Sequence, residues 1–268
     1  MTELLHMFSY HFMQRAILVG IPVSLCAALL GVSLVLKRYS MIGDGLSHVG
    51  FGALAIASAF NLAPLYVAVP TVTVAAVLLL RLSRSAKING DSTIAIISSS
   101  ALAIGVITVS LTTGMNTEVS SYMFGSILSL SAGDAVLSVL LSAGVLVLFV
   151  LFYPRIFAVT FDETFSQATG TRTDIYNTLI AVLTAVTVVL GMRMMGALLI
   201  SSLIIFPALS AMSVCRSFKS VVVTAGLISV LCFLAGLLFS YFAETPTGAS
   251  IVVADLVCLG ACRLIGRK

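Results

Sequence analysis

An acidic residue and a histidine stand four positions apart at Asp44 and His48, in a stretch that lies between long apolar segments. On an α-helix, residues four apart project from the same face, so their side chains can share one ligand. A carboxylate and an imidazole suit zinc, and also manganese or iron. An Asp in hydrocarbon costs roughly 2.5–3.5 kcal/mol on insertion scales, so a membrane protein that keeps one usually gives it a partner or a function. We interpret the pair as a candidate ion-handling site.

The same pair also fits a structural use. Asp44 could cap the N-terminus of a helix near the membrane surface, and His48 could hydrogen-bond to a neighbouring helix. The glycines that surround the pair, Gly43, Gly45, Gly50 and Gly52, fit either local unwinding or tight helix packing. An ion site reached from outside should lie deep in its path, so we expect a broken or re-entrant helix over residues 43–52.

The composition requires that these residues be carried by membrane-spanning helices. The 268-residue chain is 60% hydrophobic and 9% charged, and its mean hydropathy is +1.18. These values indicate an all-α, polytopic integral membrane protein with about eight or nine spans and no separate soluble domain. The chain contains no P-loop, so any ATP hydrolysis must come from another chain. The five cysteines include no Cys-x-x-Cys pair and predict no disulfide framework.

Hydropathy divides the chain into one transmembrane domain, residues 1–268. Residues 1–14, which carry His6 and His11, are mixed in polarity and predict an interfacial segment. Residues 122–128 are too short to span and fit a re-entrant or interfacial helix. We expect spans at about 16–36, 44–60, 65–80, 92–111, 135–153, one that ends near 190, 195–214, 221–242 and 249–265.

The cationic residues predict the orientation of these spans. If the loop at residues 81–87 is cytoplasmic, strict alternation places all Lys and Arg inside except Arg15 and Arg193, which is twelve of the fourteen. The polar segment 161–174 is then cytoplasmic. It could be a solvated connector, but its phenylalanines and Gly170 also predict a short amphipathic helix with a glycine stop. We draw no nucleic-acid inference from the net charge of +4, which mostly records this bias.

At this point the motifs resemble a known family. The basic pair Lys37 and Arg38, followed by Gly43, Asp44 and His48, is similar to the signature of the membrane subunits of zinc and manganese ABC importers. Gly45 departs from it, because the family often has Ala or Thr there. Further stretches agree in the same order and extend the resemblance over nearly the whole chain: 124–128, 161–163 with Ala168 and Gly170, 195–200 with Pro207 and Ala208, and 246–250.

The resemblance implies a multi-pass permease subunit of the cell membrane that imports a divalent metal by alternating access, with zinc expected over manganese or iron. Asp44 and His48 would contact the ion. Partners would be a second copy of the chain, a cytoplasmic ABC ATPase dimer that uses the ATP, and an extracytoplasmic metal-binding protein. The permease itself would catalyse no covalent chemistry and hold no cofactor. ATPase coupling would fall to Phe161, Asp162, Glu163, Phe165, Ala168 and Gly170.

Other acidic residues offer minority ion-path candidates. Asp255 lies within the last expected span, where hydrogen bonding to another helix is the default interpretation. Glu244, Glu118 and Asp134 lie at external ends, where charges are commonly solvated. Two rival functions stay open on the residues alone. A proton-coupled secondary transporter could use Asp44 and His48 as a relay, and a membrane metalloprotease is disfavoured because the chain has no His-Glu-x-x-His run.

Overall fold

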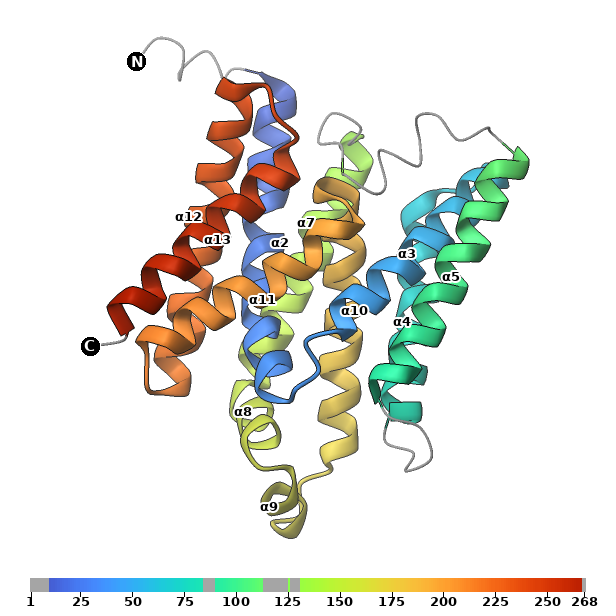
Figure 1. The fold of residues 1–268 in the computed structure, drawn as a ribbon. Helices are drawn as coiled ribbons and strands as arrows, with labels where there is room; N and C mark the ends of the chain where they lie inside the picture. Colours follow the sequence, from blue (N-terminus) through green and yellow to red (C-terminus); the bar gives the residue numbers. More distant parts are fainter. Residues whose placement is uncertain (1–9, 84–89, 113–124, 126–130, 267–268) are drawn as a thin grey trace.

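A computed structural model describes residues 10–83, 90–112, 125 and 131–266, and these form a bundle of α-helices (Figure 1). No strand occurs within these ranges. The helices are α2 (His11–Leu36), α3 (Ile42–Ala59), α4 (Pro64–Ser83), α5 (Gly90–Thr112), α7 (Ala132–Leu151), α8 (Tyr153–Phe161), α9 (Glu163–Ala168), α10 (Thr173–Met195), α11 (Ala197–Val214), α12 (Phe218–Ala243) and α13 (Thr247–Gly266).

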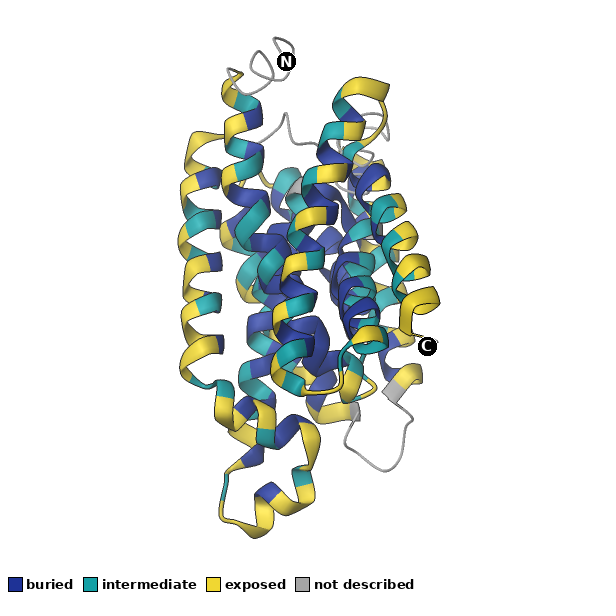
Figure 2. Cartoon of the chain, turned by 90° about the vertical axis from the view of Figure 1, so that its left-hand side faces the viewer, coloured by how far each residue is buried: buried dark blue, intermediate teal, exposed yellow. Residues whose placement is uncertain are grey.

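The expected all-α, multi-pass membrane architecture is confirmed. Seven helices are long and apolar enough to cross a membrane, namely α2, α4, α5, α7, α10, α12 and α13. The apolar part of α11, Leu199–Val214, is shorter. With α3, these helices correspond to the nine expected spans. Many exposed side chains of the outer helices are Val, Leu, Ile and Phe, and Figure 2 shows the outward faces of these helices as exposed.

Two of the expected boundaries differ from the structure. Residues 11–14 of the expected interfacial segment form the first turn of α2, which runs without a break from His11 to Leu36, and residues 1–9, with His6, lie outside the described residues. The fifth expected span divides after Leu151, since Phe152 ends α7 and the new helix α8 begins at Tyr153. The candidate re-entrant segment at 122–128 and Glu118 lie outside the described residues, apart from Gly125.

Helix α3 is enclosed by the rest of the bundle. It packs against α4, α5, α10 and α11, and most of its residues are buried. Since these neighbours surround most of α3, Asp44 and His48 lie mainly among protein groups and are only partly exposed. This enclosure explains how a helix that carries Asp44 and His48 is accommodated in a membrane protein.

The glycines of α3 allow close helix packing and do not break the helix. A Cβ at Gly52 would lie 2.7 Å from the carbonyl oxygen of Ala101 on α5, and one at Gly45 would lie 2.6 Å from Ile94 of the same helix. A Cβ at Gly50 would meet the methyl group of Met192 on α10. Because α3 is continuous from Ile42 to Ala59, the expectation of a broken or re-entrant helix was wrong, and the packing alternative is confirmed.

Candidate metal site and coupling segment

The start of α3 is carried into the bundle by the preceding loop. After α2 ends at Leu36, Arg38 adopts a positive φ of 60°, which turns the chain back on itself. Figure 1 shows that the loop over residues 37–41 then climbs along the bundle, so that α3 begins above the lower end of α2. Asp44 lies in the first turn of α3. A loop, rather than a broken helix, thus leads from α2 to the turn that carries Asp44.

Asp44 and His48 face each other along one side of α3. The His48 Nε2 atom lies 3.7 Å from Asp44 Oδ2, which is too long for a direct hydrogen bond. Nitrogen and carboxylate ligands lie about 2.0–2.2 Å from a zinc ion, so two ligands of one ion can be separated by up to about 4.2 Å. The side chains are 19% exposed for His48 and 39% for Asp44. One ion can contact both residues as they stand and still be reached from outside the bundle.

A serine from α11 completes the immediate surroundings of Asp44. Ser201 Oγ donates a hydrogen bond of 3.2 Å to Asp44 Oδ1 and ties α11 to α3. The N-cap of α3 is Met41, so the capping role considered for Asp44 is not realised. Its carboxylate instead lies in the first helical turn, where the helix dipole favours a negative charge. Among the described residues, His48 likewise forms no hydrogen bond to a neighbouring helix.

The ligand set available from one chain is small. Within the described ranges, no group of three or more His, Cys, Asp or Glu side chains could hold a metal ion. Asp44 and His48 thus supply one carboxylate and one imidazole, and within those ranges the Ser201 hydroxyl is the only hydrogen-bond donor to their side chains. The described part of the chain therefore offers an open position rather than a closed structural site.

The minority candidates Asp255 and Glu244 do not join this site. They lie on or next to α12 and α13, which Figure 1 places across the bundle from α3. Asp255 is 1% exposed, and the Cys232 thiol of the neighbouring helix α12 lies close enough to interact with its carboxylate. Glu244 ends α12 in the left-handed conformation and is exposed.

An ion pair that the sequence did not reveal joins the end of α10 to the start of α7. Arg193 Nη2 of α10 lies 2.6 Å from Asp134 Oδ2 of α7, and the side chains are 11% and 22% exposed. Both residues were expected at external ends, but their 59-residue separation gave no signal of pairing. The contact shows that Asp134 is part of a structural ion pair and is not a solvated charge.

The segment 161–174 contains the predicted short helix with a glycine stop. Asp162 caps α9 by accepting a hydrogen bond of 2.8 Å from the amide of Phe165. The chain leaves α9 at Gly170, whose φ of 82° suits glycine. Phe161 and Phe165 are 76% and 66% exposed, and Ala168 is exposed beside them. Figure 1 shows α8 and α9 projecting beyond the lower end of the bundle, so this apolar surface is open to a partner.

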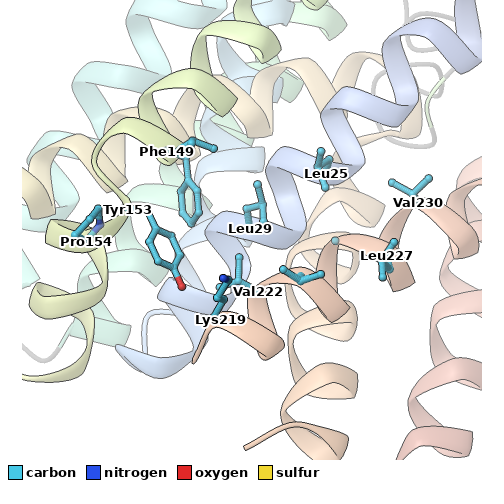
Figure 3. A pocket seen from close by; sticks show the side chains of 12 residues that line it. Leu25, Leu29, Phe149, Tyr153, Pro154, Lys219, Val222, Leu227 and Val230 are labelled. Carbon is cyan, nitrogen blue, oxygen red and sulfur yellow. The ribbon is translucent and has the colours of Figure 1, made fainter. Parts of the chain in front are cut away.

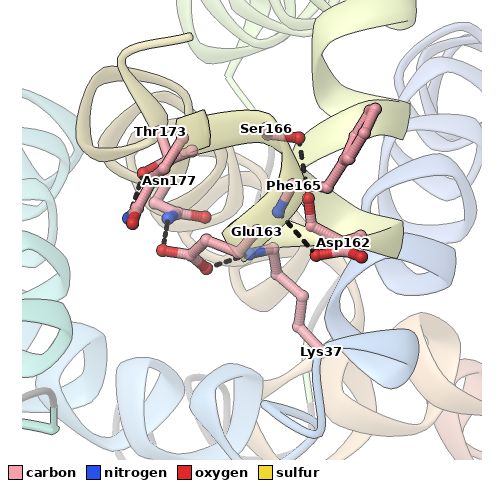
Figure 4. A network of polar contacts seen from close by, with 8 residues as sticks. Lys37, Asp162, Glu163, Phe165, Ser166, Thr173 and Asn177 are labelled. Carbon is pink, nitrogen blue, oxygen red and sulfur yellow. Dashed lines mark hydrogen bonds and ion pairs between the residues drawn. The ribbon is translucent and has the colours of Figure 1, made fainter. Parts of the chain in front are cut away.

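One carboxylate of this segment connects α9 to two transmembrane helices. Glu163 Oε2 accepts a hydrogen bond of 3.0 Å from the Lys37 amino group at the end of α2, and its Oε1 accepts one of 2.9 Å from Asn177 Nδ2 of α10 (Figure 4). The Lys37 side chain is 8% exposed. Lys37 belongs to the basic pair that precedes α3, whereas Asn177 carries no sequence signal of such a contact. The tertiary structure thus joins two motifs that are 126 residues apart.

Comparison with known proteins identifies a family and relatives for this chain. Residues 9–262 match the ABC 3 transport family. The chain is 31% identical over 250 residues to the high-affinity zinc uptake system membrane protein ZnuB of Haemophilus influenzae, covering 92% of this chain and 94% of that protein. It is 27% identical over 248 residues to the manganese import system permease protein ScaB of Streptococcus gordonii, covering 92% and 88%. Among solved structures, PsaBC from Streptococcus pneumoniae in complex with Fab is similar, with a TM-score of 0.86, 27% identity and coverage of 98% and 93%.

Proposed function

The chain belongs to the ABC 3 transport family, and on that premise we propose that it is the permease subunit of an ABC importer that carries a divalent metal ion, with zinc as the preferred ion. Relatives named for zinc uptake and for manganese import both support metal as the substrate class. The choice of zinc rests on the imidazole and carboxylate donors of the site and on the zinc relative at 31% identity.

The observation that carries the proposal is the Asp44–His48 pair inside the enclosed helix α3. A transport site must bind strongly enough to admit the ion and weakly enough to release it. Two protein ligands meet this requirement, since they leave positions for water or for a second chain. We propose that the functional unit is a homodimer, that the ion passes close to Asp44 and His48, and that an extracytoplasmic binding protein delivers it.

The contacts of Glu163 support a route for coupling. The exposed Phe161 and Phe165 suit a groove on a cytoplasmic ATPase dimer. When that dimer closes on ATP and displaces α9, the Glu163–Lys37 ion pair moves Lys37 with it. Lys37 begins the loop that leads to Asp44, so the displacement reaches the metal site. Asn177 holds the other oxygen of Glu163 and passes the same movement to α10.

ATP-dependent uptake into vesicles tests the function. The vesicles contain this chain with its ATPase and binding protein, and uptake of zinc and of manganese is measured for the native permease, Asp44→Asn and His48→Gln. We expect both variants to assemble and to lose most uptake, because each removes one of two ligands. Uptake that continues without ATP but collapses with a protonophore would instead indicate a secondary transporter.

Matched carboxylate-to-amide variants serve as controls. Glu244→Gln removes an exposed external carboxylate, and Asp255→Asn removes a buried one on the opposite side of the bundle. Both should transport metal at the native rate. Normal uptake by Asp44→Asn together with a loss in either control would place the ion path elsewhere.

A binding experiment tests the coupling segment separately. Replacing Phe165 by Asp places a charge on the exposed surface of α9 without disturbing the Asp162 cap, which bonds only the backbone of residue 165. We expect the tagged permease to recover much less ATPase, while the matched variant Phe242→Asp at the far end of α12 recovers the native amount. Equal recovery by both variants would exclude α9 as the docking surface.

A further inference from the structure

A large groove on the described surface lies between α2, α7, α8 and α12, outside the surroundings of Asp44. Leu25 and Leu29 of α2 form its floor, and Phe149 of α7 and Val222 of α12 form its walls (Figure 3). Its volume is about 700 Å³. The helices α7 and α12 both pack against α2, so the groove is the space between two helices that share one neighbour. Except at one end, its lining is apolar.

The polar end of the groove carries a cation and a hydroxyl. Figure 3 shows the Lys219 amino group and the Tyr153 hydroxyl at the same end. Neither group has a hydrogen-bond or ion-pair partner in the part of the chain that the structure describes, and Lys219 is exposed. Partial burial raises the pKa of the Tyr153 phenol above its usual range, so its hydroxyl stays protonated and able to donate. This end of the groove therefore favours an anionic group that accepts hydrogen bonds.

The groove has the length and surroundings of one membrane leaflet. Lys219 and Val230 are separated by 11 residues, which is about 16 Å of helix. This is close to half the thickness of a hydrocarbon core of about 30 Å. The rims are strongly exposed apolar residues, with Val150 at 68% and Leu227 at 61%, as on a surface that faces lipid. Lys219 lies at the end of the bundle that the positive-inside rule places in the cytoplasm.

We propose that this groove is a binding site for an anionic glycerophospholipid of the cytoplasmic leaflet. One acyl chain lies along Leu29 and Leu25 between α7 and α12. The Lys219 ammonium and the Tyr153 hydroxyl donate hydrogen bonds to the lipid phosphate and headgroup. These groups lie next to the N-terminus of α12, whose partial positive charge adds to the attraction for the anionic lipid. The lipid then fills the space between α7 and α12 and fixes their separation.

Lipid retention by the purified full-length chain tests the proposal. The probes are phosphatidylglycerol and phosphatidylcholine with identical acyl chains, supplied in equal amounts, and bound lipid is counted by native mass spectrometry. One cation near an anionic headgroup contributes about 1 kcal/mol, so we expect about a fivefold preference for phosphatidylglycerol. Lys219→Gln should lose this preference and Lys219→Arg should keep it. Arg81→Gln, which removes an exposed cation outside the groove, should leave it unchanged.

A second pair of variants tests the apolar part. A Cβ at Gly226 would lie 2.8 Å from a terminal methyl group of Leu25, which can move, so Gly226→Leu fills the groove without meeting backbone. A Cβ at Gly144 of α7 would meet nothing within 4 Å, so Gly144→Leu is the matched control. We expect Gly226→Leu to bind less than half as much of either lipid and Gly144→Leu to bind the native amount.

Three results would overturn the proposal. The first is equal retention of both lipids by the native chain, and the second is an Arg81→Gln effect as large as that of Lys219→Gln. The third is a change in the number of chains per particle, seen in the same spectra for Gly226→Leu but not for Gly144→Leu, without a change in bound lipid. That third result would show that a second copy of the chain, and not a lipid, occupies the groove.

Discussion

Breaking the Lys37–Glu163 contact should weaken both the fold and the coupling of ATP hydrolysis to uptake. The perturbation is Lys37→Met, Glu163→Gln and the double variant. Glutamine keeps an oxygen for Asn177, so Glu163→Gln removes the negative charge and leaves the second hydrogen bond in place. Methionine keeps the length and apolar stem of Lys37. The double variant then isolates the ion pair from the other contacts of the two residues.

The expected magnitude follows from the exposure of the two partners. A hydrogen bond to a charged group contributes about 1.5–3 kcal/mol, whereas an exposed ion pair contributes about 0.2–1 kcal/mol. Lys37 is nearly buried at 8% exposed, but the Glu163 side chain is 36% exposed and therefore partly screened by water. We expect a coupling free energy of about 1–2 kcal/mol, which is between these limits and corresponds to about a 5- to 30-fold change in an equilibrium constant.

The assay is a double-mutant cycle on the free energy of unfolding in detergent, combined with the number of ions taken up per ATP hydrolysed in vesicles. Each single variant should lose stability, the double variant should lose less than their sum, and uptake per ATP should fall while ATPase binding is retained. Arg81 lies outside the Lys37–Glu163–Asn177 contacts, so the change in unfolding free energy caused by Arg81→Gln should add to that of either single variant. Strictly additive losses for Lys37→Met and Glu163→Gln, together with native uptake per ATP, would refute the reasoning.

Further predictions concern packing, the external ion pair and pH. Gly52→Ala should destabilise the protein by about 1–3 kcal/mol in thermal unfolding, because its Cβ meets α5 backbone that cannot move aside, whereas Gly133→Ala should have little effect on the melting temperature. Asp134→Asn should cost about 1.5–3 kcal/mol by chemical denaturation, since it leaves the nearly buried Arg193 guanidinium without its charged partner, and equal stability of the two proteins would contradict this assignment. Burial raises the pKa of the Tyr153 phenol in the folded protein, so the contribution of this phenol to stability is complete below pH 10 and is lost as the pH rises through its folded-state pKa. The absorbance difference at 295 nm between the native chain and Tyr153→Phe, which reports the phenolate, should therefore develop only above pH 10.

Much of the fold could be predicted from the sequence because the membrane imposes a simple rule on it. Every backbone polar group in hydrocarbon must be satisfied within its own helix, so runs of apolar residues translate directly into spans. By the same rule, polar stretches between the apolar runs were predicted to lie outside the spans, and one of these stretches forms α9. The spacing of Asp44 and His48 also predicted that they share a face, since a helical turn fixes that relation locally.

The sequence was misleading where the outcome depended on neighbouring helices. The four glycines of α3 fit unwinding as well as packing, and only the close approach of α5 at Gly52 decides between them. Asp44 is reached from α2 through a loop that turns at Arg38, and hydropathy carries no information about such a turn. The sequence also did not identify Cys232 of α12 as the neighbour of Asp255, because that contact depends on how α12 and α13 cross.

By itself, then, the sequence determined the class of protein, the approximate spans and the helical pair Asp44 and His48, because these depend on composition and on contacts within one turn. Only the tertiary structure decided that α3 is enclosed, that Ser201 bonds Asp44, and that Glu163 joins Lys37 to α9. The two hydrogen bonds join residues 157 and 126 positions apart, and the geometry of all these contacts is set by helix packing, which no local pattern encodes.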